Sequence, residues 1–378
     1  MKILLFANTD WYLYNFRLEL AQALRERGDE VVLVSPDGPY APRLRDQGFR
    51  WVCFPMARRG LNPIEEMKTI IRLYKLYRLE APQLVHHFTV KCVLYGSLAS
   101  HLVGITSVVN SVEGLGYVFT EGGGSRRWLR SIIKAFYRLV LHGSWVIFHN
   151  PEDRDFFLEN RLSNPKRMVV IRGSGVDLER FSPRPLLEGT PLVILPARML
   201  WDKGLKEFIE AATLLKAEGI PARFALVGDS DDDNPVSVHK SQLQEWEKEG
   251  VIEWWGWKEK MEDVYTQASI VCLPSFYREG VPKTLIEAAA CGRPIVASDI
   301  PGCREVVRQG ENGLLVPVRD VPELAGALRR LLQNPALRSQ MGTCGRRIAE
   351  EEFSIKLVNS KTLTVYELCR NDRAGGLE

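Results

Sequence analysis

Residues 270–294, IVCLPSFYREGVPKTLIEAAACGRP, carry the pattern that decides the fold. The apolar run 270–274 is typical of a buried strand, and the segment after Pro282 has the composition of a helix that ends near Gly292. A strand, a tight polar turn and a helix start present backbone N–H groups to an anion, and Gly280 permits close approach. Glu279 and Glu287 could grip hydroxyl groups beside that anion, so the stretch favours a phosphate-linked sugar as ligand.

On both sides of this stretch, short apolar runs alternate with segments of helical periodicity. Expected strands lie at residues 3–7, 30–35, 50–54, 84–88, 107–112, 145–149 and 168–171, and again at 192–196, 224–228, 252–254, 270–273, 295–298 and 314–316. Expected helices of the first half include residues 16–27, 63–79, 93–102, 126–141 and 152–160. Continuous apolar strands between helices indicate parallel sheets covered on both faces, and therefore an α/β protein.

The chain of 378 residues is too long for one ordinary domain. A run of turn formers from Gly173 to Pro185 separates two alternating series. We therefore predict an N-terminal domain of residues 1–175, a linker of residues 176–190 and a C-terminal domain of residues 191–352. Two doubly wound domains should bind ligands at the carboxyl ends of their strands, in the cleft between them.

Composition and charge narrow the class of protein. Hydrophobic residues at 45% and charged residues at 26% are typical of a soluble globular chain. Residues 1–180 hold 25 Lys and Arg against 18 Asp and Glu, whereas residues 181–378 hold 25 against 29, so the first half is expected to meet an anionic partner. The seven scattered cysteines form no C-x-x-C pair, which disfavours a disulfide framework or a zinc site.

The stretch with Glu279 and Glu287 resembles the Glu–x7–Glu motif of the family-4 retaining glycosyltransferases. Flanking segments occur in the order of that family, namely residues 191–198, Lys203–Gly204, residues 226–229, Gly256–Trp257, Pro301–Gly302 and residues 312–317. The resemblance is dense over residues 190–350 and thinner before them. It implies the GT-B fold, in which two doubly wound Rossmann-like domains face each other across a cleft, with a C-terminal helix at residues 353–371 completing the first domain.

The resemblance also implies roles in the second domain. Arg198 and Lys203 would bear the charge of the leaving diphosphate, because fixed cations stabilise that charge most in the transition state. Glu279 would contact the transferred sugar, and Glu287 would bind the ribose hydroxyls of the donor. Further donor contacts are predicted for Gly228, Trp257, Gly280, Val281, Pro282 and Lys283.

Some of these residues have a structural alternative. Arg198 and Lys203 could be solvated cations beside helices, and Trp257 could pack in the core of its Trp-rich strand. Glu287 fits an exposed helix position poorly, because its neighbours are apolar. The habits of the family favour a UDP-sugar as donor substrate with no separate cofactor. Asp229–Ser230–Asp231 lacks the flanks of a metal site, so we predict no metal.

The acceptor would bind to the first domain. Residues 8–17 replace the glycine-rich loop common in this fold with aromatic side chains. Together with residues 86–91 and 113–119, they resemble a subgroup that makes bacterial lipid-linked glycans. On this basis we predict that the acceptor contacts Asn15, Arg17, His87, Lys91, Gly116 and Tyr117.

Two of these segments leave other interpretations open. Asn15 could instead cap a helix, and of His86 and His87 one is expected to pack and the other to face the cleft. Glu113 ends a strand before a glycine, where it could bind the sugar or orient the incoming hydroxyl. It could equally hold the amides of the glycine turn.

The expected helix 126–141 is amphipathic. At about 100° per residue, its cations lie on one arc and its aromatic and aliphatic side chains on the other. Such a helix suits the surface of an anionic membrane, although an ordinary surface helix is the alternative. We predict membrane contact through Arg126, Arg127, Trp128, Arg130, Lys134 and Arg138.

Taken together, the resemblance and the residues predict a retaining, metal-independent glycosyltransferase. It would move a sugar, an N-acetylhexosamine in the first instance, from a UDP-sugar to a polyprenyl-diphosphate-linked saccharide. It would work in the cytoplasm, at the inner face of the cell membrane, without a nucleic-acid partner. A UDP-sugar 2-epimerase of the same fold and a non-catalytic glycan- or lipid-binding protein are the alternatives.

Overall fold

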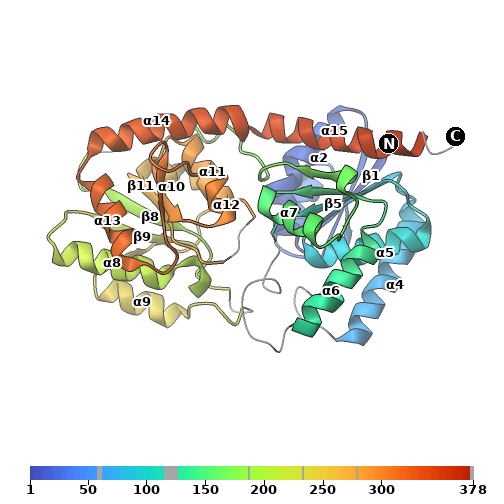
Figure 1. The fold of residues 1–378 in the computed structure, drawn as a ribbon, viewed down its shortest axis with the longest axis horizontal. Coiled ribbons are helices and arrows are strands. Elements are labelled where there is room, and N and C mark those ends of the chain that lie inside the picture. Colours follow the sequence, from blue (N-terminus) through green and yellow to red (C-terminus); the bar gives the residue numbers. More distant parts are fainter. Residues whose placement is uncertain (58–61, 115–126, 186–187, 232–233, 278–279, 375–378) are drawn as a thin grey trace. The chain divides into compact units, whose positions relative to one another are not determined.

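The computed structural model describes residues 1–57, 62–114, 127–185, 188–231, 234–277 and 280–374. The chain forms two compact units, of which the first comprises Met1–Ser174 with Ile355–Glu378 and the second Gly175–Ser354. Each unit is a parallel sheet with helices on both faces (Figure 1).

The first unit is built on a seven-stranded sheet of order β3-β2-β1-β4-β5-β6-β7. Its strands are β1 (Lys2–Phe6), β2 (Glu30–Ser35), β3 (Arg50–Cys53), β4 (Leu84–Phe88), β5 (Val108–Val112), β6 (Trp145–Phe148) and β7 (Met168–Val170). Its helical elements are α1 (Asp10–Tyr12), the π-helical turn η1 (Leu13–Arg17), α2 (Leu18–Glu26), α3 (Ala41–Asp46), α4 (Pro63–Glu80), α5 (Val90–Val103), α6 (Arg127–Val140), α7 (Pro151–Glu159), the 3-10 turn η3 (Pro165–Arg167) and α15 (Ile355–Ala374).

Strand alternation divides the core of the first unit into two layers. Ile3 and Leu5 of β1 pack with α2 and α15, whereas Leu4 and Phe6 pack with α4 and α5 on the other face. In register, Ile3 lies opposite both Val31 of β2 and Leu84 of β4. The strand order reverses between β1 and β4, which places a topological switch point at their carboxyl ends.

The second unit has a six-stranded sheet of order β10-β9-β8-β11-β12-β13. Its strands are β8 (Leu192–Pro196), β9 (Arg223–Val227), β10 (Glu253–Trp254), β11 (Ile270–Leu273), β12 (Ile295–Ser298) and β13 (Gly313–Val316). Its helices are the 3-10 turn η4 (Trp201–Lys203), α8 (Leu205–Ala217), α9 (Lys240–Lys248), α10 (Met261–Gln267), α11 (Lys283–Ala290), α12 (Pro301–Arg304), α13 (Val321–Leu332) and α14 (Pro335–Glu352). Its switch point lies between β8 and β11.

The segment 176–190, which we expected to be a linker, begins inside the second unit. Val176 and Phe181 are buried in a core cluster of this unit, and the Val176 N–H donates to the Phe353 carbonyl oxygen at 2.9 Å. These two apolar side chains gain more by burial than a free linker would offer them. The first part of the segment is therefore structural.

Candidate active site

In each unit, the predicted site residues and the side chains that contact them lie where parallel strands end. Tyr12 and Arg17 follow β1, Glu113 follows β5 and His149 follows β6 in the first unit. In the second unit Arg198 follows β8, Gly228 follows β9, Trp257 follows β10, and residues 275–287 follow β11. The carboxyl edges of parallel sheets are the usual ligand-binding positions of doubly wound folds.

The carbonyl oxygen of Asp202 ties two loops of the second unit together. It accepts hydrogen bonds from the Ser275 hydroxyl at 3.0 Å, the Phe276 N–H at 3.0 Å and the Tyr277 N–H at 3.3 Å. Gly204, which directly follows Lys203, has a φ of 78° and lies so close to the Pro274 carbonyl that a Cβ would clash with it. The turn that carries Lys203 is thus fixed to the loop that leads to Glu279.

Lys203 and Arg198 differ in their surroundings. The Lys203 ammonium is half-buried and lies 5.6 Å from the centroid of the Tyr277 ring. Arg198 is exposed, and its Nη1 donates to Asp231 Oδ2 at 2.9 Å. Lys203 therefore lies on a turn that backbone hydrogen bonds fix, and Arg198 forms an ion pair with Asp231.

The two carboxylates of Asp229–Ser230–Asp231 each face a cation. Asp231 pairs with Arg198, and Asp229 Oδ1 lies 3.6 Å from the Lys240 ammonium. In the described part of the chain, no group of three His, Cys, Asp or Glu residues could hold a metal ion.

Glu287, in the second turn of α11, is buried and contacts polar groups from two helices. The Tyr265 hydroxyl of α10 donates to Glu287 Oε2 at 3.0 Å, and the Lys283 ammonium lies 3.8 Å from Oε1. Burial raises the pKa of Glu287 above its ordinary value, against the lowering effects of Lys283 and Tyr265. This carboxylate is held in one orientation at an energetic cost, which is common at binding sites.

The remaining donor candidates also follow strands of the second unit. Trp257 is 51% exposed, so it does not pack in the core, and its ring is accessible to a ligand. Gly228, with a φ of 145°, lies so close to the Ala197 carbonyl oxygen that a Cβ would clash with it. The Gly228 N–H donates to the Gly256 carbonyl oxygen at 2.9 Å. Gly280 is buried, Val281 packs on the core and Pro282 is the N-cap of α11.

A buried cluster joins Tyr12, Arg17 and Glu113 in the first unit. The Tyr12 hydroxyl and Arg17 Nη2 both donate to Glu113 Oε1. Arg17 also donates to the Tyr12 oxygen, from Nε at 3.0 Å and from Nη2 at 2.8 Å, and its guanidinium lies 4.4 Å from the centroid of the Phe88 ring. Although burial opposes it, Tyr12 and Glu113 raise the pKa of Arg17, which stays charged.

Two buried imidazoles border this cluster. His149 Nε2 lies 3.8 Å from Glu113 Oε1, and burial lowers the pKa of His149 to about 4. His86 bonds to the Tyr366 hydroxyl at 2.7 Å and to Ser111 Oγ at 2.8 Å, and burial lowers its pKa well below the ordinary value. Both rings are therefore neutral at neutral pH, and among the described residues Arg17 is the cation paired with Glu113.

Several acceptor predictions meet a structural obstacle. His87 is fully buried on the opposite face of the sheet, where Tyr77 and Asn110 bond to its two ring nitrogens at 2.9 and 2.8 Å, so the expectation that it contacts the acceptor is wrong. Neither His86 nor His87 is exposed, because strand alternation sends them into the two core layers.

Lys91 and Asn15 have partners of their own. The Lys91 ammonium donates to Glu66 at 2.6 Å and to the Ala57 carbonyl oxygen at 3.2 Å. Asn15 donates to the Trp11 carbonyl oxygen at 2.9 Å, while Thr9 is the residue that caps α1. The capping interpretation of Asn15 is therefore wrong.

Helix α6 exposes apolar as well as basic side chains. Phe136, Tyr137 and Val140 pack into the first unit, whereas Ile132 and Leu139 are 55% and 66% exposed. Lys134 and Arg138 donate to the Asn160 side chain and carbonyl oxygen at the end of α7. Among the described helices, none has the length and apolar composition to cross a bilayer.

Some predicted residues lie outside the described residues. These are Gly116, Tyr117, Arg126 and Glu279, together with the side chains of Arg127 and Trp128. Conversely, Tyr12, His149 and Tyr265 contact predicted site residues but were not predicted from the sequence. Tyr12 lies in the aromatic segment after β1 and His149 follows a strand end, which are the signals that could have identified them.

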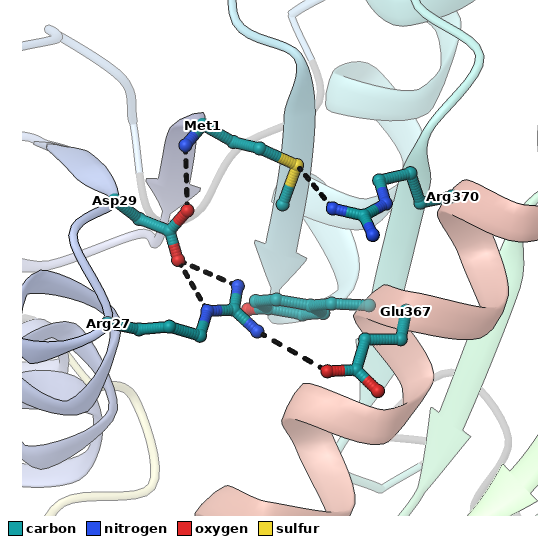
Figure 2. A pocket seen from close by; sticks show the side chains of 6 residues that line it. Met1, Arg27, Asp29, Glu367 and Arg370 are labelled. Atoms are coloured by element: carbon teal, nitrogen blue, oxygen red, sulfur yellow. Dashed lines mark hydrogen bonds and ion pairs between the residues drawn. The ribbon is translucent and has the colours of Figure 1, made fainter.

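A pocket of the first unit has a volume of about 280 Å³, and Figure 2 shows the side chains that line it. Its charged groups satisfy one another, since Asp29 pairs with Arg27 at 2.7 Å and with the Met1 amine at 2.8 Å. Arg27 also lies 3.9 Å from Glu367. The pocket is lined by none of the predicted site residues, so we do not assign it to the candidate active site.

Comparison with known proteins gives the same class from both halves of the chain. The family model "Glycosyl transferases group 1" matches residues 190–334, and "Glycosyl transferase 4-like" matches residues 2–150. The Anabaena protein Alr3699/HepE, solved with UDP-glucose, is 18% identical and superposes with a TM-score of 0.79 over 98% of this chain and all of that one. A GT-B glycosyltransferase structure thus shares the fold.

Two curated relatives match along most of their length. The N,N'-diacetylbacillosaminyl-diphospho-undecaprenol alpha-1,3-N-acetylgalactosaminyltransferase of Campylobacter jejuni is 29% identical over 94% of this chain and 95% of its own. The UDP-Gal:alpha-D-GlcNAc-diphosphoundecaprenol alpha-1,3-galactosyltransferase of Escherichia coli is 26% identical over 88% of both. The chain belongs to the family-4 glycosyltransferases with the GT-B fold.

Proposed function

We propose that this glycosyltransferase transfers a sugar from a UDP-sugar to a saccharide carried on a polyprenyl diphosphate, with retention at the anomeric carbon. An N-acetylhexosamine is the first candidate for the transferred sugar. The observation that carries the proposal is the corner tied by the Asp202 carbonyl, which fixes Lys203 beside the loop after β11. Relatives whose names specify diphospho-undecaprenol acceptors support the acceptor class.

The donor would lie along the carboxyl ends of β8 to β11. Lys203 and Arg198 would bind the diphosphate, the start of α11 would add backbone N–H groups, and Glu287 would accept hydrogen bonds from the ribose. The exposed ring of Trp257 offers a surface for the base. Glu279 is proposed to contact the transferred sugar.

The reaction would proceed on one face of the sugar. The bond between the anomeric carbon and the diphosphate oxygen breaks while the bond to the acceptor oxygen forms, and the acceptor proton passes to the leaving diphosphate. Lys203 and Arg198 would stabilise the charge that develops on that diphosphate. We propose that no metal takes part, in keeping with the pairing of Asp229 and Asp231 to cations of the chain.

A lipid-linked acceptor would require the protein to work at a membrane surface, and we place it at the inner face of the cell membrane. Helices α4 and α6 both pack against α5. Besides Ile132 and Leu139 of α6, four apolar side chains of α4 are exposed, namely Ile64, Met67, Ile71 and Leu79. The same helix exposes the cations Lys68, Arg72, Lys75 and Arg78. Helices that expose both apolar side chains and cations favour binding to an anionic membrane.

A screen of nucleotide-sugars tests the donor, because a ligand that binds only the folded protein raises its melting temperature. UDP-N-acetylhexosamines should raise it more than GDP-sugars. Product analysis then separates three activities, namely transfer to a polyprenyl-diphosphate saccharide, epimerisation without acceptor, and binding without turnover. Stabilisation by GDP-sugars alone, or epimer formation without acceptor, would contradict the proposal.

A further inference from the structure

The described contacts of the Glu113 carboxylate all involve one of its two oxygens, Oε1. Oε1 accepts from the Tyr12 hydroxyl and from Arg17, and it is also the oxygen nearest His149. Among the residues that the structure describes, none bonds to Oε2. The Glu113 side chain is 17% exposed, so this oxygen belongs to a carboxylate that solvent or a ligand can reach.

The π-helical turn explains why Tyr12 and Arg17 meet. Residues five apart lie on different sides of an α-helix, whereas the i to i+5 hydrogen-bonding pattern of a π-helix brings them together. Tyr12 precedes η1 and Arg17 ends it, and both side chains are buried. Turns of this kind are rare and frequently occur at functional sites.

Asp10 fixes the other end of this segment. Its Oδ2 accepts from the Tyr40 N–H at 2.6 Å and from the Ala41 N–H at 2.9 Å, and Gly38 packs directly against it. The segment from Asp10 to Arg17 is thus held by the loop after β2 at one end and by Glu113 at the other. Arg17 is committed to internal contacts and has little surface for a substrate.

From this arrangement we propose that Tyr12 and Arg17 are positioning residues, which hold Glu113 as a carboxylate whose Oε2 accepts a hydrogen bond from the acceptor saccharide. Arg17 places its positive charge against Oε1, and Tyr12 fixes the rotation of the carboxylate about its terminal bond. Arg17 therefore acts through Glu113 and does not contact the acceptor itself, contrary to the prediction from sequence. This inference rests on the proposed function.

A double-mutant cycle separates positioning from simple structural support. The variants are Tyr12→Phe, Glu113→Ala and the double variant, with Glu113→Gln in place of Glu113→Ala if the latter does not fold. The probes are UDP-N-acetylgalactosamine and UDP-N-acetylglucosamine as donors, with undecaprenyl-diphosphate-linked N,N'-diacetylbacillosamine and N-acetylglucosamine as acceptors. Transfer rates, the dissociation constant of UDP and melting temperatures are measured for each variant.

Tyr12→Phe should lower kcat/KM for the acceptor about tenfold in the wild-type background and less than twofold when Glu113 is replaced. The dissociation constant of UDP should not change, since the donor binds the other unit. Tyr366→Phe is the matched control, because it removes a buried hydroxyl that bonds to His86 without touching Glu113. It should lower the melting temperature and leave transfer within about twofold of wild type.

Equal losses from Tyr12→Phe in both backgrounds would overturn the positioning role while leaving the proposed function intact. A wild-type protein that binds UDP but transfers no sugar to any of these acceptors would contradict the proposed function and this inference together. The two failures are therefore distinguishable by the wild-type rate alone.

Discussion

The candidate sites of the two units are built in opposite ways. In the second unit, loops tied by backbone hydrogen bonds present an exposed Arg198 and a half-buried Lys203. In the first unit, buried side chains far apart in sequence close around Glu113. A site formed by loops that backbone hydrogen bonds hold in place depends on the local sequence. A site formed by buried side chains that contact one another depends on the whole fold. Substitutions should accordingly affect chemistry in the former and chemistry coupled to stability in the latter.

Lys203→Ala should give the largest effect and sharpens this comparison. Loss of the cation beside the leaving group should lower kcat by about 100-fold or more. The melting temperature should stay within about 4 °C of wild type, because the turn is held by the Asp202 carbonyl and Gly204. Steady-state transfer and thermal unfolding provide the measurements.

Lys206→Ala is the control for this change, since Lys206 is an exposed neighbour whose ammonium lies 3.7 Å from Glu210. It should leave both kcat and the melting temperature unchanged. Turnover of Lys203→Ala equal to that of Lys206→Ala would remove Lys203 from the mechanism.

Glu287→Gln tests whether Glu287, which is proposed to bind the donor, lowers the stability of the folded protein. The variant should weaken UDP binding by about 10- to 100-fold, because a charged acceptor for the ribose is lost. Burial raises the pKa of Glu287 in the folded state, so the native protein binds this proton more tightly than the unfolded chain does. Wild-type stability should therefore fall as pH rises above the ordinary range of a glutamic acid.

It follows that Glu287→Gln should melt higher than wild type at pH 7, and that this difference should vanish as pH falls through the ordinary pKa of glutamic acid. Calorimetric titration with UDP and melting curves across pH measure both effects. A variant that melts lower than wild type at pH 7 would mean that Tyr265 and Lys283 compensate fully for the burial of Glu287.

Replacement of both Ile132 and Leu139 by Glu tests the proposed membrane surface of the first unit. It should lower binding to anionic liposomes by about tenfold, since the variant loses exposed apolar groups and gains charges that anionic lipid repels. Leu214→Glu is the control, because Leu214 is a similarly exposed leucine of the second unit. Equal sedimentation of all three proteins with vesicles would argue against this surface.

Asn15→Ala should have the smallest effect. The Asn15 amide donates to the Trp11 carbonyl oxygen one turn earlier, so its loss should change stability by less than about 0.5 kcal/mol and acceptor KM by less than about twofold. A tenfold rise in acceptor KM would restore Asn15 as a contact of the acceptor. Such a result would also show that the first unit presents side chains as openly as the second.

Most of the fold could be predicted because apolar runs bounded by turn formers define buried strands. The predicted bounds of β2, β4, β8, β11 and β12 match the observed ones. The prediction that residues 176–190 form a linker was wrong for the first part of that segment. Turn formers dominate the local pattern around Val176, although Val176 and Phe181 are buried in a core cluster. The π-helical turn could not be predicted, since no local pattern distinguishes it from the start of α2.

The candidate site, like the fold, could be predicted only in part. Spacing placed Arg198 and Lys203 after the first strand of the second domain and Glu287 in the helix that follows the polar turn, where the structure has them. Spacing could not predict that His86 and His87 are both buried, because their hydrogen-bond partners come from three other elements, α4, β5 and α15. Nor could it pair Arg17 with Glu113, since they lie 96 residues apart in sequence.

The ion pair between Arg198 and Asp231 has a consequence for selectivity. If Arg198 binds the diphosphate of the donor, that diphosphate competes with the Asp231 carboxylate for the guanidinium, so ligand entry can exchange one anion for another. A weakly charged or singly charged competitor gains little from such a swap, whereas a doubly charged diphosphate displaces Asp231 readily. The resident carboxylate would thereby screen out small anions that are abundant in the cell.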